Sequence, residues 1–396
     1  MFLLKSKDKA VLTFTKEFFE GEYSVKINEI LEPKLLPALV KLVPGKEQIY
    51  FNMWIKNRSI SINRYYIKEI LRALGFDRYD PIDLVLYAKG LSLNDTYWIQ
   101  DTGKSELSWE AINLYQNTFK DSLEYVTFFG HSKSLGGKLQ SSAELTLGGM
   151  LPKCWRREDG RTYLYKRGTS EYANAGREPV IEAIAYKIGK LLGVNIAEQQ
   201  LLHYEGYLCT KSNNFTTISS SFVPAYEYLK DLEPKLWSYD MISDRLGLVE
   251  ELDDMIVFDY IINNTDRHFA NFGVLIEPDT HVITGFAPLF DHGYSLLHNT
   301  MDSDYPINQE EWYSRIIGPS SRERAKSVFS PKHRESVHNL LADLDTLFTE
   351  DLLRIANKER LLISEYMVQE ILAMVKWRCM DLLKGRIMPW DDPRAD

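Results

Sequence analysis

Apolar and polar residues alternate near the start of the chain in the manner of half-buried strands. The alternation covers Val11–Phe14 and Tyr23–Ile27 and predicts two neighbouring strands. Residues 46–130 look mainly helical, most clearly over 63–74, where apolar side chains recur every three or four positions before Gly75. Three large aromatic residues stand in a polar part of this region that we expect to be mainly loops: Trp98, Trp109 and Tyr115.

A second hairpin is predicted farther along the chain. Lys153–Arg156 and Arg161–Lys166 flank Asp159-Gly160, which is a favoured two-residue hairpin turn. The segment from Pro179 to Leu192 then carries an apolar stripe at helical spacing. Its proline suits the first helical position, and Gly193 suits the position just past the end. We therefore expect a hairpin followed by an amphipathic helix.

The remaining pattern combines further strands with a helical C-terminal part. It predicts strands within 196–223, a helix over Leu248–Ile262, a hairpin of Gly273–Ile276 with Val282–Phe286, and three helical segments from Pro331 to about Lys384. The polar composition of residues 298–330 predicts an irregular segment. A chain of 396 residues is long for one domain. We expect three regions, with bounds 1–130, 131–223 and 224–396.

Composition narrows the classes of function. With 44% hydrophobic and 26% charged residues the chain is typical of a globular protein with a sizeable core. A net charge of −9 argues against direct binding of nucleic acid, although a basic partner stays open. Three cysteines without metal-type spacing fit a reducing cytoplasm. The start has no signal-peptide pattern and no apolar run is long enough to span a membrane, so we expect a cytoplasmic protein.

The stretch 264–272 carries the clearest chemistry. Asp266 precedes Asn271 by five positions, and Asp291 follows after a predicted hairpin. A kinase catalytic loop supplies its base and its magnesium ligands in this order, and Mg²⁺ prefers oxygen ligands of these types. The alternative is that these residues only cap loops. A zinc site made of Asp266, His268 and His292 is a further alternative, but no cysteine or closely spaced histidine supports it.

Lys166 and the acids that follow it complete a kinase-like order. Lys166 ends a predicted strand, and Glu178 and Glu182 open the next helix. In a kinase the strand lysine reaches the nucleotide phosphates and a helix glutamate fixes its position. Alone, the lysine and the acids would be solvated surface residues, since acids are favoured at helix starts. Their position before Asp266 favours the kinase interpretation.

The segment 131–150 is rich in glycine and serine and lies where a phosphate-covering loop would sit. It lacks the GxGxxG spacing of protein kinases and the GxxxxGK[ST] spacing of P-loops, so a flexible linker is the alternative. The basic residues beside it either form a solvated hairpin face or help to neutralise phosphate: Lys153, Arg156, Arg157, Arg161 and Arg167.

The order of these motifs resembles the HipA family of serine/threonine kinases, known chiefly as toxins of bacterial toxin–antitoxin modules. The family's catalytic stretch has the form N-T-D-x-H-x-x-N-F, followed by a hairpin and P-x-[YF]-D. Here these motifs are Asn264–Phe272 and Pro288–Asp291. The helix from Glu182 to Gly193 is also similar to the family's glutamate-bearing helix. The resemblance covers roughly residues 140–385.

The resemblance implies an α+β, two-lobed protein-kinase-like (HipA-like) fold, with a mixed α/β N-terminal region and a mostly helical C-terminal lobe. Residues 131–223 would be the nucleotide-binding part and 224–396 the catalytic lobe. It also implies ATP and Mg²⁺ as cofactors. The resemblance implies Asp266 as the catalytic aspartate and Asn271 and Asp291 as Mg²⁺ ligands. Lys166 would contact the phosphates, paired with Glu182 rather than Glu178. The backbone around Cys209 to Lys211 would lie near the adenine, and Ser141 or Ser142 would be a regulatory phosphorylation site.

We therefore expect a kinase that transfers the γ-phosphate of ATP to a Ser or Thr hydroxyl of a protein. The resemblance further implies autophosphorylation and an antitoxin partner that binds DNA. The glycine-rich loop departs from the family's Gly-Ala-Gln-Glu-Lys form. Asp291-His292-Gly293 is also similar to phosphoinositide kinases, which leaves lipid and small-molecule hydroxyls open as acceptors. A non-catalytic nucleotide-binding regulator that works through residues 1–130, and a DNA-associated regulator that acts through a basic partner, are the remaining alternatives.

Overall fold

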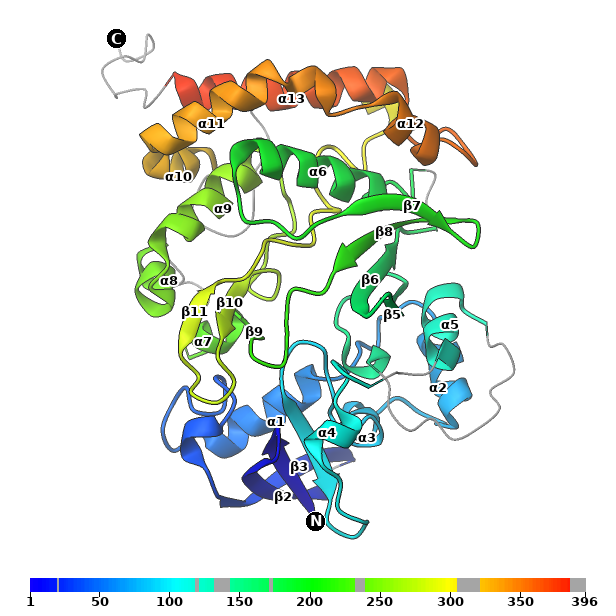
Figure 1. Ribbon diagram of the computed structural model, residues 1–396, viewed down its shortest axis with the longest axis vertical. Helices are drawn as coiled ribbons and strands as arrows, with labels where there is room; N and C mark the ends of the chain where they lie inside the picture. The colour runs from blue at the N-terminus through cyan, green and yellow to red at the C-terminus, as the bar shows by residue number, and fades with distance from the viewer. Residues whose placement is uncertain are drawn as a thin grey trace. The chain divides into compact units, whose positions relative to one another are not determined.

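The computed structural model describes residues 1–19, 21–117, 121–131, 143–170, 174–231, 239–304 and 321–384. The chain forms two compact units that alternate along the sequence (Figure 1). The first unit comprises Met1–Lys166, Asn213–Leu232 and Gly273–Ala287, and the second comprises Arg167–Ser212, Glu233–Phe272 and Pro288–Asp396. The three-region division expected from the sequence stays a prediction.

An antiparallel sheet of four strands forms the N-terminal part of the first unit. Its order is β3-β2-β1-β4, with β1 Phe2–Ser6, β2 Lys9–Phe19, β3 Glu22–Ile30 and β4 Tyr97–Asp101. The predicted pair of strands is therefore confirmed as β2 and β3. The loop expected around Trp98 is wrong, because this residue is fully buried in β4. Four successive residues of β4 are buried, so the alternation that reveals a half-buried strand is missing.

Helix α1 (Glu47–Asn57) covers the outer edge of β3. Asn52 Oδ1 accepts a hydrogen bond from the Val25 amide at 2.8 Å, and Gln48 Oε1 accepts one from the Ile27 amide at 2.8 Å. Gln48 Nε2 and Asn52 Nδ2 also donate to the Val25 carbonyl, at 2.6 and 2.8 Å respectively. Backbone groups that an edge strand leaves without a strand partner are thus satisfied by side chains of a helix.

Short helices and two further strand groups complete the first unit. The helices are α2 Ile67–Leu74, α3 Pro81–Tyr87, α4 Trp109–Ile112, α5 Asp121–Phe129 and α7 Tyr226–Leu229, with the 3₁₀ turns η1 Pro33–Leu35 and η2 Glu144–Thr146. Helix α2 confirms the helix predicted before Gly75, which has a φ of +78° and ends it. The strand groups are the hairpin of β5 Lys153–Glu158 with β6 Arg161–Arg167, and the sheet β11-β10-β9.

Turn geometry explains why both predicted hairpins are present. Asp159 and Gly160 have φ values of +49° and +77°, the pair of positive angles that a tight two-residue turn requires. The other hairpin joins β10 Gly273–Ile276 to β11 Ile283–Phe286, and β9 Ser221–Pro224 pairs with β10 on its other side.

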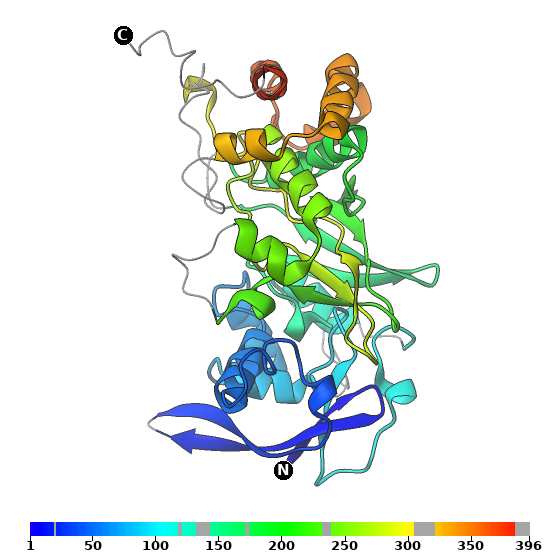
Figure 2. The same cartoon turned by 90° about the vertical axis from the view of Figure 1, so that its left-hand side faces the viewer.

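The second unit is mostly helical. Its elements are α6 Glu178–Leu192, β7 Gln200–Tyr204, β8 Tyr207–Asn213, α8 Tyr239–Leu246, α9 Val249–Ile261, the 3₁₀ turns η4 Asp302–Asp304 and η6 Leu344–Thr346, α10 Ser321–Val328, α11 Pro331–Ala342, α12 Glu350–Ala356 and α13 Glu365–Leu383. Helix α11 packs against both α6 and α13 (Figures 1 and 2). The predicted helices around 179–192, 248–262 and 331–384 are confirmed.

One part of the segment expected to be irregular is a helix. Residues 321–328 form α10. Its buried residue is Ala325, so the sequence of this helix carries no apolar stripe from which the helix could be predicted. Its attachment is ionic instead. Arg322 and Lys326 both donate to the carboxylate of Asp381 on α13, at 2.8 and 2.9 Å for Nε and Nζ. Hydrophobic periodicity cannot reveal a helix that is held in this way.

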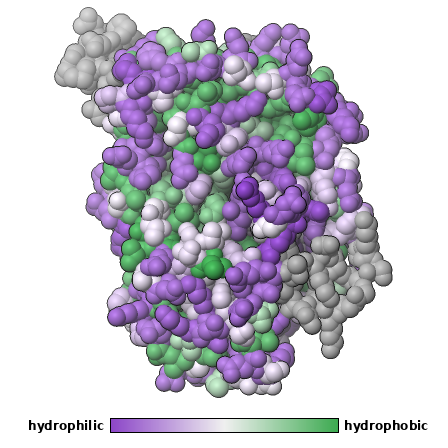
Figure 3. Space-filling model, in the orientation of Figure 1, coloured by the Kyte–Doolittle hydropathy of each residue, from purple (hydrophilic) through white to green (hydrophobic). Residues whose placement is uncertain are grey.

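Figure 3 shows one face of the molecule, where hydrophilic residues surround separate apolar areas. Large apolar side chains that are exposed lie far apart in the sequence, for example Phe18, Val282 and Leu361. Single exposed apolar residues of this kind are ordinary and do not by themselves mark a docking site. Within the part of the chain that the structure describes, no helix combines the length and apolar character needed to cross a membrane.

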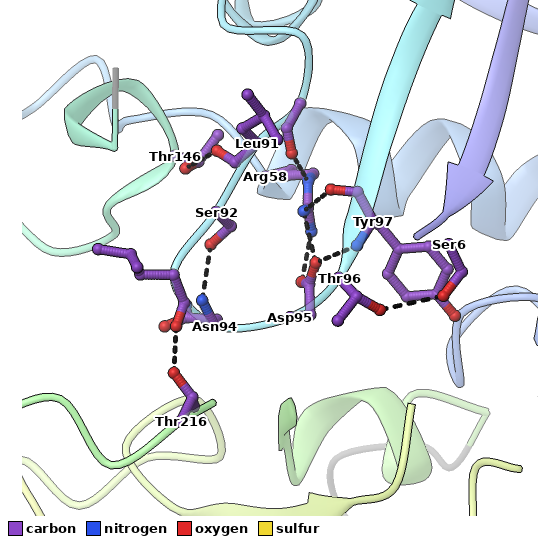
Figure 4. A network of polar contacts seen from close by, with 12 residues as sticks. Ser6, Arg58, Leu91, Ser92, Asn94, Asp95, Thr96, Tyr97, Thr146 and Thr216 are labelled. Carbon is purple, nitrogen blue, oxygen red and sulfur yellow. Dashed lines mark hydrogen bonds and ion pairs between the residues drawn. The ribbon is translucent and has the colours of Figure 1, made fainter. Parts of the chain in front are cut away.

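A polar network ties the segment before β4 to three other parts of the first unit (Figure 4). The guanidinium of Arg58 donates to both oxygens of Asp95 at 2.6 Å and to the carbonyl of Tyr97 at 3.1 Å. Hydroxyls of Thr146 and Thr216 donate to carbonyls of residues 91 and 93. The segment is therefore held by side chains from distant parts of the sequence.

Candidate active site

The predicted catalytic stretch is the loop that follows α9 in the second unit. Its first residues are fixed by an acid on the helix itself, because Asn264 Nδ2 donates to Asp259 Oδ1 at 2.9 Å. The side-chain oxygen of Asn264 in turn accepts the amide of Asp266 at 3.1 Å. Thr265 donates its amide and its hydroxyl to the carbonyl of Tyr294, at 3.1 and 2.8 Å. The backbone on both sides of Asp266 is thus held in one conformation.

A buried arginine forms the centre of the loop. Arg267 donates from Nε and Nη2 to the two carboxylate oxygens of Asp259, at 2.8 and 2.9 Å. Its Nη1 donates to the carbonyls of Asn271 at 2.6 Å and Phe290 at 3.0 Å. Bidentate pairing of a guanidinium with a carboxylate is strong and directional. One side chain therefore joins α9, the end of the catalytic stretch and the segment that leads to Asp291.

Asp266 and Asn271 occupy different environments within this loop. Asp266 is exposed, whereas Asn271 is buried. Asn271 Nδ2 donates to the Asp266 carbonyl at 3.1 Å, and the Asn271 amide donates to the carbonyl of His268 at 2.8 Å. With its nitrogen used in this way, the amide of Asn271 has a defined orientation. Asp266 is therefore accessible to a substrate, and Asn271 belongs to the loop framework.

The Asp291–Gly293 segment lies against the start of α6. Asp291 has a φ of +62°, a conformation that costs energy for a residue with a side chain. A Cβ placed on Gly293 would come within 3.1 Å of Glu178 Cβ and 3.4 Å of Glu182 Oε1, so only glycine fits without movement. His292 is fully buried and packs edge-on against Phe258, with ring centroids 5.2 Å apart.

The two acids of α6 have distinct surroundings. Both Glu178 and Glu182 are buried. Glu178 Oε2 accepts the amide of Thr169 at 3.2 Å, which ties the start of the helix to the segment before it. Lys166 belongs to the first unit, on β6, so its pairing with Glu182 stays a prediction.

The remaining predicted residues have less definite surroundings. Cys209 is fully buried in β8, and burial raises the pKa of its thiol to about 12, so it is a neutral packing residue. Lys211 is half-buried on the same strand. Their position near an adenine stays a prediction. Ser141 and Ser142 lie outside the described residues.

Three residues that fix the loop were not predicted from the sequence. Asp259 and Arg267 form the pair described above, and Arg378 of α13 donates to the Tyr260 carbonyl at 2.7 Å and to Asn263 Oδ1 at 3.1 Å. A signal was present at Asp259, an acid that lies among apolar residues on both sides in an otherwise buried helix segment. A lone acid in such a run is expected to have a buried partner. The sequence offered no comparable signal for Arg378.

The donor set fits the metal implied by the resemblance. The side chains of Asn271 and Asp291 offer an amide oxygen and a carboxylate, which are oxygen ligands of the kind Mg²⁺ prefers. Arg267 holds the backbone segments that carry both, since it donates to Asn271 and to the residue before Asp291. Within the described ranges, no three His, Cys, Asp or Glu side chains gather as a metal site.

Comparison with known proteins bears on the fold. Neither a scan of protein-family models nor a search of curated proteins gives a match. Solved structures do match. HipA of Shewanella oneidensis MR-1, solved in a toxin–antitoxin complex with HipB and operator DNA, is 12% identical over 97% of this chain and 98% of its own, with a TM-score of 0.51.

A second solved structure is similar over a shorter stretch. The proinflammatory kinase CtkA of Helicobacter pylori is 16% identical over 59% of this chain and 91% of its own, with a TM-score of 0.44. The match to HipA extends over nearly the whole of both chains, including the N-terminal region that the sequence motifs did not cover. The predicted α+β fold class is confirmed, and the chain has a HipA-like kinase fold.

Proposed function

We propose that this protein is an ATP- and Mg²⁺-dependent kinase that transfers the γ-phosphate to a Ser or Thr hydroxyl of a protein. The observation that carries the proposal is the position of Arg267, which joins the backbone after Asp266 to the segment that bears Asp291. A catalytic acid and two oxygen ligands held by one buried side chain suit a reaction that depends on positioning and electrostatics. The HipA-like fold supports the same reaction class.

Each residue has a separate task in this proposal. Asp266, which is exposed, orients the acceptor hydroxyl and receives its proton. Asn271 and Asp291 hold Mg²⁺, which supplies positive charge against the phosphate oxygens. Lys166 contacts the phosphates, and Glu182 fixes its position. These assignments rest on the order of the residues, on the fold, and on the contacts within the loop.

The direct test is incubation of the full chain with γ-labelled ATP and Mg²⁺, alone and with a cell lysate. Wild type is expected to label a protein band, and Asp266→Ala is expected to lose at least about 100-fold of this transfer because the acid–base contribution disappears. A matched control is Asp279→Ala, an acid of the β10–β11 turn in the first unit. Transfer by Asp266→Ala at the wild-type rate would remove the assignment.

The same experiment separates the alternative acceptors. Label that appears in lipid or in small molecules, but not in protein, would assign the protein to a different class of kinase. Binding of ATP without transfer to any acceptor would favour a nucleotide-binding regulator. Absence of ATP binding would exclude all three.

We further propose an antitoxin partner with DNA-binding ability. Its support is the match to HipA, whose structure was solved with HipB and operator DNA. The net charge of −9 fits a protein that reaches DNA through a basic partner rather than directly. Co-purification with a small basic protein, and DNA binding by that complex but not by this chain alone, is the expected result.

A further inference from the structure

The backbone that begins at the candidate metal ligand Asp291 is strained. Asp291, Leu296 and Leu297 have φ values of +62°, +47° and +61°, in the left-handed region that residues with a side chain rarely adopt. Each such residue costs energy, and the conformation persists only where the surroundings hold it. The stretch 291–300 therefore needs attachments that keep it in place, and these attachments decide the conformation of Asp291.

The middle of the stretch is attached to the catalytic loop and its helix. The amide of Leu296 donates to the carbonyl of Ile262, at the end of α9, at 2.8 Å. The carbonyl of Tyr294 accepts the amide and the hydroxyl of Thr265, at 3.1 and 2.8 Å. Leu296 is itself fully buried. A movement of the stretch would therefore displace the backbone beside the catalytic aspartate.

The start of α6 contacts the same stretch at two places. At the first, a Cβ built on Gly293 would lie 3.1 Å from the Cβ of Glu178. At the second, Nη1 of Arg177 donates to the carbonyl of Thr300, which is a buried residue. Arg177 directly precedes Glu178, so adjacent residues carry both contacts. The two strained leucines lie between these contacts, and release of the second contact would let their backbone relax.

Arg177 also contacts a third segment of the second unit. Its Nε donates to the carbonyl of Leu362, which lies between α12 and α13, at 2.8 Å. A guanidinium can hold two carbonyls in different directions because it carries five N–H donors in a rigid plane, whereas an ammonium is one compact donor centre. A neighbouring contact, from Asn174 Nδ2 to the Asn299 carbonyl, supports the same attachment of the stretch.

We propose that Arg177 is a positioning residue of the candidate active site. By holding Thr300 it keeps the strained stretch against the start of α6, and this attachment keeps Asp291 in the conformation in which its carboxylate binds Mg²⁺. Arg177 acts through Asp291 rather than on the metal or the substrate. The inference rests on the proposed function, since Mg²⁺ bound with ATP is taken as the ligand. Such a role suits a reaction that depends on held geometry.

The first measurement is hydrogen–deuterium exchange of the full chain without nucleotide or metal. Arg177→Met keeps the aliphatic stem but removes the donors. Amides of 291–300 are expected to exchange about tenfold faster in this variant, because hydrogen bonds from a charged group are lost. The matched control is Arg354→Met, at an exposed arginine of α12 that pairs with Asp351 of the same helix. It should exchange like wild type.

The second measurement is calorimetric titration with ATP over a range of Mg²⁺ concentrations. The Mg²⁺ concentration that gives the half-maximal gain in ATP affinity is expected to rise about tenfold in Arg177→Met, while ATP binding without Mg²⁺ stays as in wild type. Arg177→Lys keeps the charge but not the planar fork of donors, and should resemble Arg177→Met. A general loss of stability would instead speed exchange throughout the second unit and leave the Mg²⁺ requirement unchanged.

Two results would overturn the inference: exchange of 291–300 at the wild-type rate in Arg177→Met, or faster exchange there with an unchanged Mg²⁺ requirement. If Arg177→Met does not fold, Asn174→Ala replaces it and is judged in the same way, with smaller shifts expected in both measurements. Faster exchange of the stretch in the variant, together with no ATP binding by wild type at any Mg²⁺ concentration, would reject the proposed kinase while supporting the attachment by Arg177.

Discussion

Two buried charged clusters, one in each unit, are built in opposite ways. In the second unit the carboxylate of Asp259 is matched by Arg267, which donates to both of its oxygens. In the first unit the buried acid Glu227 and the partly buried acid Asp95 lie near one guanidinium, and Arg58 donates to both oxygens of Asp95. The cluster of the second unit matches one acid with one base, whereas the cluster of the first unit contains an additional acid. Balance of charge inside the protein decides whether a cluster fixes geometry or responds to protons.

The additional acid shows this difference directly. Glu227 Oε2 accepts the Leu39 amide at 3.2 Å, yet burial is the largest influence and raises the pKa of this carboxyl to about 7. A cavity of about 20 Å³ lies beside it, lined in part by Asp95 and Ser221. Ser221 Oγ is buried and has no hydrogen-bond partner among the described residues. The cavity has the size and polarity to hold a water molecule.

The largest effect is expected from a substitution in the balanced pair of Asp259 and Arg267. Arg267→Met should lower the free energy of unfolding by about 3–5 kcal/mol, because it leaves Asp259 buried without its cation. Phosphoryl transfer should fall at least about 100-fold, since the segments that carry Asn271 and Asp291 lose their common donor. Urea denaturation and the labelled-ATP assay measure the two effects.

A double variant sharpens the same point. Asp259→Leu with Arg267→Met removes both charges and should recover part of the lost stability, while transfer stays low. Recovery of transfer in the double variant would show that the pair serves stability alone.

The cluster with the additional acid should respond to pH. The pKa of Glu227 in the folded protein is about 7, above its ordinary value, so the folded state holds an extra proton between about pH 4.5 and 7. The stability that the folded protein keeps by holding Glu227 protonated is complete below that pH range and is lost as the pH rises through it. The change in the free energy of unfolding caused by Glu227→Gln should therefore be more stabilising at pH 8 than at pH 4, by about 3 kcal/mol.

The measurement is the difference in unfolding free energy between variant and wild type across this pH range. Glu29→Gln, at an exposed acid of β3, is the matched control and should give a flat difference. A flat profile for Glu227→Gln as well would mean that Glu227 is charged at all these pH values.

A smaller effect is expected at Asp381, a second matched acid. It accepts from Arg322, Lys326 and Tyr260, and although burial opposes it, these donors lower the pKa of the carboxyl to about 2. Its contribution is present above about pH 4 and disappears as the pH falls towards 2. Asp381→Asn should cost about 1–2 kcal/mol at pH 7 and nothing near pH 2. A cost that does not change with pH would point to packing rather than charge.

Periodicity and turn chemistry were sufficient to predict most of the elements near the site. The turn at Asp159-Gly160 even sets the register of its hairpin, because a two-residue turn makes Glu158 and Arg161 neighbours. Counting back from that turn places Lys153 opposite Lys166. That both lysines are buried does not follow from the local sequence, since it depends on packing with distant segments.

Other features were beyond sequence reasoning for specific physical reasons. Strand β4 is buried on both faces and carries no alternation. Helix α10 is held by ion pairs and carries no apolar stripe. The pair of Asp259 and Arg267 joins a helix to a loop, and a charge pattern alone does not show which acid meets which base. Motifs therefore identified the candidate site, but not the side chains that hold it.

The side-chain amides along β3 have a consequence for assembly. Exposed strand edges commonly recruit a further strand, either from another copy of the same chain or from a peptide ligand. At Val25 and Ile27 the outward amides are already bound by Asn52 and Gln48, so strand addition there would first have to displace α1. At Val25 and Ile27 this edge is therefore protected from pairing with strands of other chains, as in fibrils. A partner that binds the first unit at these positions must contact side chains rather than pair with the backbone.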